Sequence, residues 1–450
     1  MVRSLVTTLV LTPLVVLAAC SSSAPGGSAE ADAGASSSAS ALTWHRDVRP
    51  VVEKRCATCH VEGGFAPFAL GSFADAHAHR ASIAAAVDAR TMPPWPPSDA
   101  CNHYEHDRSL TDAERETIVG WARGDSAEGD PATYVPPSLA AVETMRIDRT
   151  LGMTEAYTPV QSPDEYRCFV MDWNETTSKF VTGLRVKPGY APIVHHAIAF
   201  LAAPSDAAAV VKLDADDPGP GYKCFGGIGV GGVNAGWLGA WVPGSTTSLM
   251  PAGTGIEVAP GSKVVLQMHY NTASTAARPD QSSVELQVDD TVATRAAVLK
   301  FANPSWVTQK TMSIKAGDAD SVQSFAFGVS PYMSRITGGV LADGAPFTIR
   351  SAALHMHSRG VKGTLSVVHP DGTRDCALEI DDWSFHWQDS YRLQTPIVVQ
   401  PGDELSLECH FDNSGHRQPL VDGKPATVTD VNWGETTEDE MCLGVMYATP

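Results

Sequence analysis

Residues 404–411 read ELSLECHF, and this stretch decides the fold of the larger part of the chain. Its apolar residues alternate with polar ones, so an extended strand has one apolar and one polar face. Residues 364–380, TLSVVHPDGTRDCALEI, contain two further strand-like runs joined by a turn at Pro370-Asp371-Gly372. From about Pro131 onward, alternation and turn signals replace helical periodicity. The pattern predicts antiparallel β-sandwiches.

Two pairs of histidines lie in strand-like stretches of this region. ALHMHSRG places His355 and His357 two residues apart, so that both imidazoles leave the same face of a strand and can hold one metal ion. IVHHAIAF contains His195 and His196. Adjacent strand residues point to opposite faces, so joint binding of a metal by this second pair requires a strand end or a bulge.

Two further residues extend the set of metal-binding side chains. His269 lies in LQMHYN and Met441 in EDEMCLGVMY. Taken alone, each is as well explained by a place in the core or on the surface of a sheet. Imidazole nitrogen supports Cu(II) and thioether sulfur favours Cu(I), whereas zinc rarely recruits methionine. The combination predicts copper that cycles between its two oxidation states.

Aromatic residues gather in the stretch DDWSFHWQDSYRL. Two interpretations stay open, because such residues line a substrate pocket in some proteins and form the core of a sheet in others. The residues concerned are Trp383, Phe385, Trp387 and Tyr391.

The region from Trp44 to about Asp125 has helical periodicity instead. Val48, Val51 and Val52 form an i, i+3, i+4 stripe, and TDAE at residues 111–114 is a capping box that opens a helix. We expect a small all-α domain of the cytochrome c type over residues 43–130, followed by a linker over residues 131–145.

The sequence RCATCHVEGG contains Cys56, Cys59 and His60 in the CxxCH spacing that attaches a c-type haem through two thioethers. His60 is expected as one axial ligand of the haem iron. Met92, in RTMPPWPP, is favoured as the other, because prolines stiffen its loop and a thioether opposite histidine raises the haem potential. The alternatives for this second ligand are His77, His79, His103 and His106.

The first twenty residues read as an export signal, with Arg3 followed by an apolar run that ends in LAAC. The ending resembles the lipobox of bacterial lipoproteins, which makes Cys20 the expected lipidated residue; ordinary signal cleavage is the alternative. Residues 21–42 contain almost nothing that can be buried and are expected to be a flexible linker. We therefore expect a lipid-anchored protein of the bacterial cell envelope, facing the periplasm or the exterior.

Composition excludes some partners and suggests disulfides. The 450 residues carry a net charge of −19, which argues against nucleic acid and anionic lipid headgroups as partners. Of nine cysteines, six remain after Cys20, Cys56 and Cys59 are assigned, and thiols in an oxidising compartment usually form disulfides. The six are Cys101, Cys168, Cys224, Cys376, Cys409 and Cys442.

Several motifs, in chain order, resemble those of the copper type II, ascorbate-dependent monooxygenases, the family of dopamine β-monooxygenase and the peptidylglycine α-hydroxylating enzymes. The motifs are IVHHAIAF, GWLGAWVPGS, PAGTGIEVAPGSKVVLQMHY, LHMHSRG and DEMCLG. The resemblance spans roughly Arg146 to the C-terminus. It implies two β-sandwich domains, residues 146–297 and 298–450, that face each other across a wet cleft with one copper on each.

The resemblance also implies roles for individual residues. One copper, which passes on an electron, would be held by His195, His196 and His269. The second, where O₂ binds and the substrate C–H bond is hydroxylated, would be held by His355, His357 and Met441. The family disulfides would correspond to Cys168 with Cys224 and Cys409 with Cys442, which leaves Cys101 and Cys376 unassigned.

The chain departs from the family pattern at one informative position. The peptide-amidating branch has an arginine two residues before the first histidine of its HxH, where it binds the substrate carboxylate, and this chain has Ala353. A C-terminal peptide glycine is therefore a poor candidate substrate. MCLG at residues 441–444 is more similar to the dopamine β-monooxygenase branch.

Together these features predict a copper monooxygenase that hydroxylates a small organic substrate with O₂. The reaction needs two electrons from outside, and the family takes them singly from ascorbate. A tethered cytochrome c can load the coppers in place of ascorbate, or between ascorbate and the metal. The alternative is a non-catalytic lipoprotein that binds copper and haem for electron transfer or metal handling. The complete set of six copper ligands favours the enzyme.

Overall fold

The computed structural model describes residues 41–450 except 63–65, 139–143, 225, 231–235, 243–247, 273–274, 386, 422–423, 435 and 437, and only the backbone of Val421. Cys20, the export signal and nearly all of the linker lie outside the described residues. Residues 42–450 form one compact unit. No helix within the described ranges is both long and apolar enough to cross a membrane.

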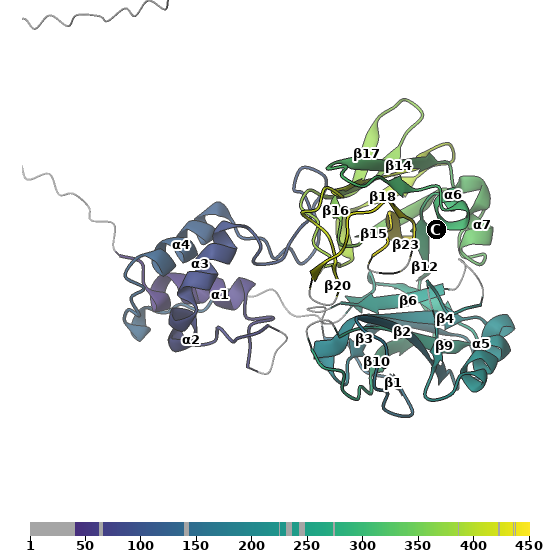
Figure 1. The fold of residues 1–450 in the computed structure, drawn as a ribbon, viewed down its shortest axis with the longest axis horizontal. Helices are drawn as coiled ribbons and strands as arrows, with labels where there is room; N and C mark the ends of the chain where they lie inside the picture. The colour runs from purple at the N-terminus through teal and green to yellow at the C-terminus, as the bar shows by residue number, and fades with distance from the viewer. Residues whose placement is uncertain are drawn as a thin grey trace, which may run out of the picture. The chain divides into compact units, whose positions relative to one another are not determined.

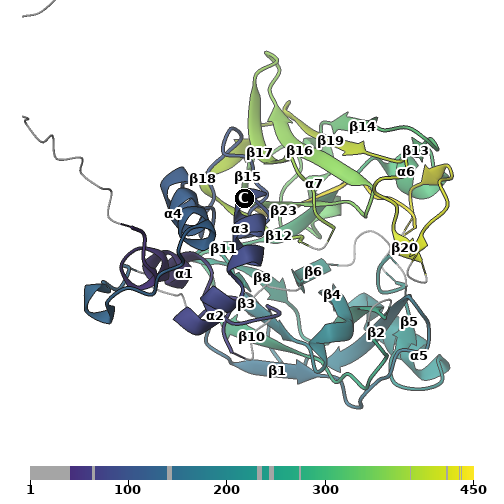
Figure 2. The same cartoon turned by 60° about the vertical axis from the view of Figure 1, so that its left-hand side comes forward.

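The first part of this unit is a helical module, which we define as residues 42–134, and its four helices lie together in Figures 1 and 2. Thr111 and Glu114 form the expected capping box, in which the side chain of each accepts the backbone N–H of the other. Buried Trp44, Ile118 and Trp121 are part of its core. The elements are η1 (Trp44–Val48), α1 (Arg49–Arg55), α2 (Phe73–Ala78), α3 (Arg80–Asp88), α4 (Asp112–Arg123) and η2 (Pro131–Thr133).

Between α3 and α4 the chain is not helical. Pro93, Pro94, Pro96 and Pro97 prevent a helix here, because proline lacks the N–H donor and clashes with the preceding turn. Residues 95–108, which we call the docking segment, lie along the sheets of the C-terminal region. Isolated bridges pair its Pro97 with Ile380 and its Tyr104 with Leu393.

Two sheets make up residues 149–295, and they share one apolar core that includes Val284, Leu184, Leu266 and Met268. The strands of the first sheet, in spatial order, are β1 (Arg149–Gly152), β10 (Ser283–Asp289), β3 (Lys179–Lys187), β8 (Thr254–Val258) and β11 (Thr294–Arg295), with β7 (Ser248–Leu249) on β3. Those of the second are β5 (Tyr222–Lys223), β2 (Asp164–Asp172), β9 (Lys263–Asn271), β4 (Val194–Ala202) and β6 (Gly236–Trp241). Short helices η3 (Ala191–Ile193) and α5 (Pro204–Asp216) flank β4.

Two further sheets make up residues 297–449 around a second core, which includes Leu354, Leu365, Leu407 and Met446. One sheet has the order β12 (Ala297–Phe301), β23 (Leu443–Thr449), β15 (Phe347–His355) and β18 (Tyr391–Val399). The other has the order β14 (Ser321–Phe327), β19 (Glu404–Phe411), β16 (Gly360–Val368) and β17 (Arg374–Ile380), which form one layer in Figure 2. The remaining elements are α6 (Pro304–Gln309), β13 (Ser313–Ile314), η5 (Ser330–Tyr332), α7 (Met333–Ile336), β20 (Leu420–Val421), β21 (Lys424–Pro425) and β22 (Val431–Asn432).

The mostly β character that the sequence predicts is confirmed. In β19 the apolar residues are buried and the polar residues between them are not, as the alternation of ELSLECHF predicts. The buried residues are Leu405, Leu407, Cys409 and Phe411. β16 and β17 form the expected antiparallel hairpin around Pro370-Asp371-Gly372. Tyr447 joins the two strand regions, since its hydroxyl lies 2.8 Å from that of Thr254.

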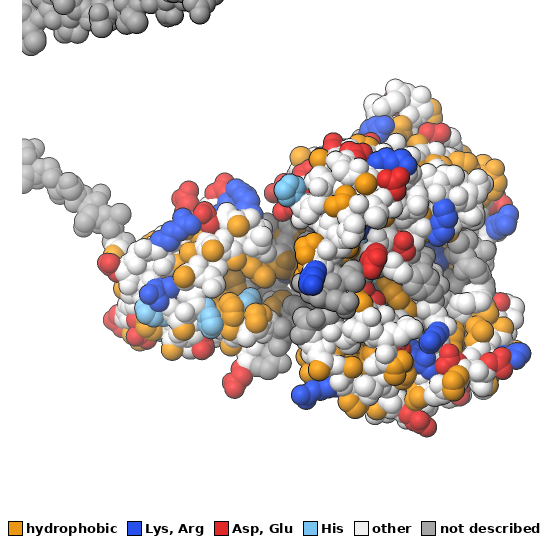
Figure 3. Space-filling view, in the orientation of Figure 1, with side chains coloured by type: hydrophobic (Ala, Val, Ile, Leu, Met, Phe, Trp, Pro, Cys, Tyr) orange, Lys and Arg blue, Asp and Glu red, His pale blue; other side chains and the backbone are white. Residues whose placement is uncertain are grey.

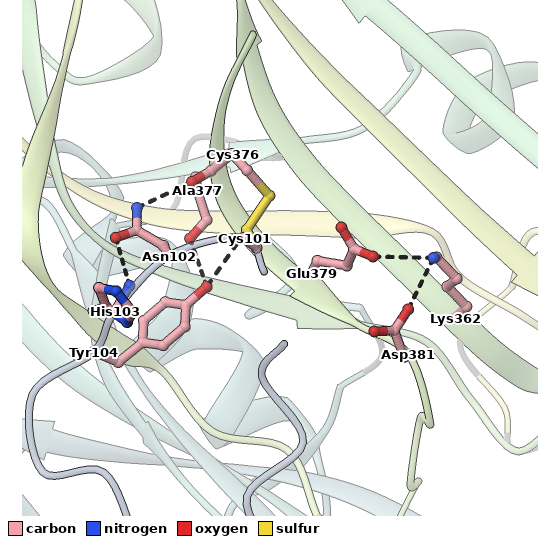
Figure 4. The surroundings of a disulfide bond; sticks show 9 residues. All are labelled: Cys101, Asn102, His103, Tyr104, Lys362, Cys376, Ala377, Glu379 and Asp381. Carbon is pink, nitrogen blue, oxygen red and sulfur yellow. Dashed lines mark hydrogen bonds and ion pairs between the residues drawn. A yellow bond between two sulfur atoms is a disulfide. The ribbon is translucent and has the colours of Figure 1, made fainter. Parts of the chain in front are cut away.

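Three disulfides link the described residues. Cys168 on β2 is bonded to Cys224, and Cys409 on β19 to Cys442, just before β23. The third bond joins Cys101 of the docking segment to Cys376 on β17, across 275 positions of sequence (Figure 4). The two cysteines that the family resemblance leaves unassigned therefore attach the helical module to the C-terminal region.

Candidate metal centres

His195, His196 and His269 form the first centre, which we call site A. Their potential ligand atoms all lie within 4.8 Å of one another. The Nδ1 atom of His196 is 3.4 Å from Nδ1 of His195 and 3.3 Å from Nδ1 of His269. Nitrogens at these separations either share a proton or converge on a cation, so the donor set fits a metal ion.

The backbone explains how two adjacent histidines reach one point. β4 pairs with β9 so that Val194 faces Tyr270 and His196 faces His269, and the register shifts between Val194 and His196. This irregularity re-aims His195, because a bulge changes the direction in which a strand presents its side chains. His269 comes from the middle of the sheet and is only 1% exposed.

A carboxylate supports site A from behind. Asp164 Oδ1 lies 2.8 Å from His269 Nε2 and also accepts the amide N–H of Asn271 at 2.8 Å. In this contact the Nε2–H of His269 donates to the carboxylate, which leaves the Nδ1 lone pair facing the cluster. The ring of Tyr166 stacks on His269 with centroids 4.1 Å apart. Burial, reinforced by the charges of neighbouring histidines, holds the pKa of His196 well below its usual range, so this imidazole is neutral and able to bind a metal.

His355 and His357 form a second pair of imidazoles, and we call this pair, with the predicted ligand Met441, site B. The two imidazole centroids are 5.1 Å apart. The sequence pattern predicts both histidines on one face of a strand, which is wrong for His357, because β15 ends at His355 and His357 follows it. Nδ1 of His355 lies 2.6 Å from Gln388 Oε1, and Nδ1 of His357 lies 3.0 Å from the carbonyl of Asp439. Each contact leaves Nε2 as the lone-pair nitrogen.

Buried Glu440 explains why the chain turns at His357. Its carboxylate accepts the backbone N–H of His357 at 2.8 Å and that of Arg359 at 2.6 Å. These bonds hold the segment that contains Met441, itself 6% exposed, against the HxH turn. Burial raises the pKa of Glu440 to about 8 although both backbone donors oppose the rise. Burial and the nearby charge of His355 lower the pKa of His357 to about 3.

Phe385 lies between the two sites. Its ring stacks on His195 of site A at 4.7 Å and is 6.0 Å from the ring of His357 of site B. The charges of His355 and His357 also contribute to the lowered pKa of His196, which places the sites within electrostatic reach of each other. The other members of its aromatic cluster, Trp383, Trp387 and Tyr391, are buried, and Trp383 and Tyr391 belong to the C-terminal core. Phe385 contacts the imidazole rings, whereas Trp383 Nε1 donates to the backbone carbonyl of His357 at 3.1 Å.

Comparison with known proteins bears on site B directly. Residues 340–449 match the C-terminal domain of the copper type II ascorbate-dependent monooxygenases. This matched region holds all three site B residues, and it supports the family for this part of the chain.

Relatives among characterised sequences agree, over short segments. The human "Putative DBH-like monooxygenase protein 2" is 26% identical over 133 residues, 29% of this chain and 24% of that protein. The mouse "DBH-like monooxygenase protein 2" is 30% identical over 112 residues, 24% of this chain and 16% of that protein. The match thus spans a quarter or less of either relative. Among solved structures, one from infectious bursal disease virus covers 70% of this chain and 75% of its own, at 10% identity and a TM-score of 0.17.

The CxxCH motif follows α1 directly. Its backbone continues in helical turns, with the N–H of Cys56 donating to Val52 and that of His60 to Cys56. Cys56 and Cys59 are free thiols. Nδ1 of His60 lies 2.9 Å from the carbonyl of Phe68, which leaves Nε2 as the lone-pair nitrogen.

The second haem ligand is not decided by these contacts. Met92 is 43% exposed, and His79 stacks on Phe68 at 3.9 Å, beside His60. Figure 3 shows histidine and hydrophobic side chains gathered on one face of the helical module. The donor set fits a c-type haem, and both its attachment and the choice of Met92 stay predictions.

Several supporting residues have no signature in the sequence. Asp164, Gln388 and Glu440 are acceptors far along the chain from the histidines they contact, and such residues are common on any surface. The Cys101–Cys376 disulfide could have been predicted in one way, because these two cysteines are left over once the two disulfides implied by the family resemblance are assigned.

Proposed function

We propose that this chain is a copper-dependent monooxygenase that hydroxylates a C–H bond of a small organic substrate with O₂, with one copper in site A and one in site B. The observation that carries the proposal is the presence of two histidine groups, one of three imidazoles and one of two, on either side of Phe385. The second group lies beside the segment of buried Met441, since Glu440 bonds the backbone of His357. The match of residues 340–449 to the family's C-terminal domain supports it.

When bound, copper supplies one-electron storage and the activation of O₂. The protein's part is to keep the imidazoles neutral and correctly oriented. Burial keeps the imidazoles of His196, His355 and His357 neutral, because it lowers their pKa values. Hydrogen bonds orient the imidazoles, which donate to Asp164 at site A and to Gln388 Oε1 and the Asp439 carbonyl at site B. The thioether of Met441 adds a soft ligand that favours the reduced metal.

We further propose that a haem attached at Cys56 and Cys59, with His60 and Met92 as axial ligands, supplies or relays the electrons. Unpaired thiols and a histidine whose Nδ1 is already bonded support this donor assignment. Ascorbate or another small reductant would reduce the haem or the coppers. A lipid on Cys20 would anchor the protein in the bacterial cell envelope.

The test is the amount of copper and haem per polypeptide after loading and removal of excess metal. We expect two coppers and one haem in the native chain and the loss of about one copper in His195→Ala and in His355→Ala. His410→Ala is the matched control, because the imidazole of His410, on β19, bonds Asp320 and Glu408 and is not one of the predicted copper ligands. Variants that keep their copper would sink the two-site proposal.

Catalysis is tested separately by O₂ consumption in the presence of a panel of small substrates. An enzyme consumes O₂ in proportion to the substrate added. A loaded chain that reduces O₂ equally with and without every substrate would instead favour the non-catalytic, copper- and haem-binding alternative.

A further inference from the structure

The docking segment fixes the helical module on the C-terminal region. Cys101 is disulfide-bonded to Cys376, and the Tyr104 hydroxyl donates to the carbonyl of Ala377 at 3.2 Å (Figure 4). The side chain of Arg392 donates to Glu105 at 2.9 Å. The module is therefore held beside β17 and β18 by a covalent bond and by strand-like pairing.

One end of the docking segment touches the CxxCH motif. Arg55, which precedes Cys56, donates from Nη1 to the carbonyl of Asp107 at 3.0 Å. Arg108 follows Asp107 in the chain, so this hydrogen bond places Arg108 beside the motif.

The same arginine reaches the loop that supports site B. Arg108 Nη2 donates to Asp389 at 3.1 Å, and its guanidinium lies over the ring of Trp387, 5.1 Å from the centroid. Trp387 and Asp389 flank Gln388, whose Oε1 lies 2.6 Å from Nδ1 of His355. A route from Cys56 to His355 therefore follows the chain except at three hydrogen bonds. These join Arg55 to Asp107 at 3.0 Å, Arg108 to Asp389 at 3.1 Å and His355 to Gln388 at 2.6 Å.

The seam between module and loop also offers a donor to a further group. Arg108 Nε is buried and has no hydrogen-bond partner among the described residues. Buried N–H groups normally have one. This N–H is a donor of the kind that a haem carboxylate would accept from.

We propose that electrons leave the CxxCH module through this seam and enter site B first, with Arg108 as the positioning residue of the route. The inference rests on the proposed function. In each transfer one electron passes from ferrous haem, which becomes ferric, to Cu(II) held by His355, His357 and Met441, which becomes Cu(I). Site A comes later on the same route, since Gln388 Nε2 donates to the Phe385 carbonyl and the Phe385 ring stacks on His195.

The experiment uses the full chain loaded with haem and Cu(II), without O₂. A flash-excited ruthenium complex injects one electron into the haem, and the haem absorbance then reports its reoxidation, independently of turnover. We expect a haem reoxidation rate that does not depend on protein concentration. This rate should stay within about twofold in His195→Ala and should fall to the rate of the copper-free chain in His355→Ala. Loss of the decay in His195→Ala, or its retention in His355→Ala, would overturn the inference.

Arg108 is tested in the same way. Arg108→Gln should slow the decay about tenfold, equivalent to about 1.4 kcal/mol of barrier, while the Cu(II) electron paramagnetic resonance spectrum of site B is unchanged. Arg108→Lys should restore part of the rate, and Arg115→Gln, whose arginine pairs with Asp112 on α4, is the matched control. An unchanged rate in Arg108→Gln would remove Arg108 from the route. A chain that binds no haem would overturn the haem part of the proposed function and the route with it. A haem-loaded chain in which the variants behave otherwise overturns the route alone, which separates the two failures.

Discussion

Sites A and B both take histidines from antiparallel sheets, but the chain builds them in different ways. Site A takes all its ligands from two neighbouring strands, β4 and β9, and needs one register shift to assemble. Site B begins at the end of one strand and is completed by loops that contain Gln388 and Glu440. The geometry of site A therefore follows from strand pairing, whereas that of site B depends on side-chain hydrogen bonds between distant segments.

Removal of Glu440 should show the largest difference. Glu440→Ala leaves the backbone N–H groups of His357 and Arg359 buried without an acceptor, and each such group costs about 1–3 kcal/mol. We expect the free energy of unfolding of the copper-free chain to fall by about 3 kcal/mol or more, measured by denaturant titration. Site B should lose copper while site A keeps it.

Glu438→Ala is the control for this change, because Glu438 is exposed and only its backbone carbonyl bonds Arg359. Equal effects of the two substitutions would mean that the turn at His357 does not depend on the buried carboxylate, and the contrast between the sites would weaken.

Asp164→Ala tests the support of site A. Loss of the carboxylate behind His269 frees the imidazole to change tautomer and orientation, and loss of such a partner typically costs 10–100-fold in metal affinity. We expect a decrease of about that size at site A alone, measured by competition with a chelator. Asp172→Ala, at the other end of β2 where Asp172 pairs with Lys263, should leave both affinities unchanged.

Gln388→Ala is the corresponding change at site B, and a smaller effect is expected. A neutral amide oxygen orients His355 less strongly than a carboxylate does, so we expect about a tenfold loss of copper affinity, the lower end of the range for such partners. Exposed Gln400 provides the control, as Gln400→Ala. A loss at site A as large as at site B would show that Gln388 acts through Phe385 on both sites.

The sequence predicted local features of this structure well. The alternation of residues 404–411 predicts β19, and TDAE predicts the start of α4, because a strand face and a capping box are set by neighbours in sequence. The same holds for the adjacent pair His195 and His196, for which the pattern requires a bulge or a strand end, and the register shifts at that position.

The docking segment shows where sequence reasoning stopped. The prolines at its start indicate a stiff loop, and the sequence predicts that this loop presents Met92 to a haem. The structure pairs that loop with strands almost 300 residues later, at Ile380 and Leu393. Nothing local encodes such a partner, since an extended segment with free backbone groups can pair with any exposed strand edge. The partners of His269 and His355 were hidden for the same reason.

The smallest effect concerns a histidine outside both sites. His369, at the turn between β16 and β17, lies 3.0 Å from Asp403 and 3.1 Å from Asp375, and these hydrogen bonds raise its pKa. This shift is opposite to the lowered pKa values of His196 and His357. A raised pKa gives stability that is full below the ordinary histidine pKa of about 6.5 and is lost as the pH rises through the folded value. The free-energy difference between the native chain and His369→Asn should therefore be larger at pH 6 than at pH 9, measured by denaturant titration of the copper-free chain. A difference that does not change with pH would show that packing alone holds His369. It would also contradict the contrast between this histidine, whose pKa is raised, and the metal-site histidines, whose pKa values are lowered.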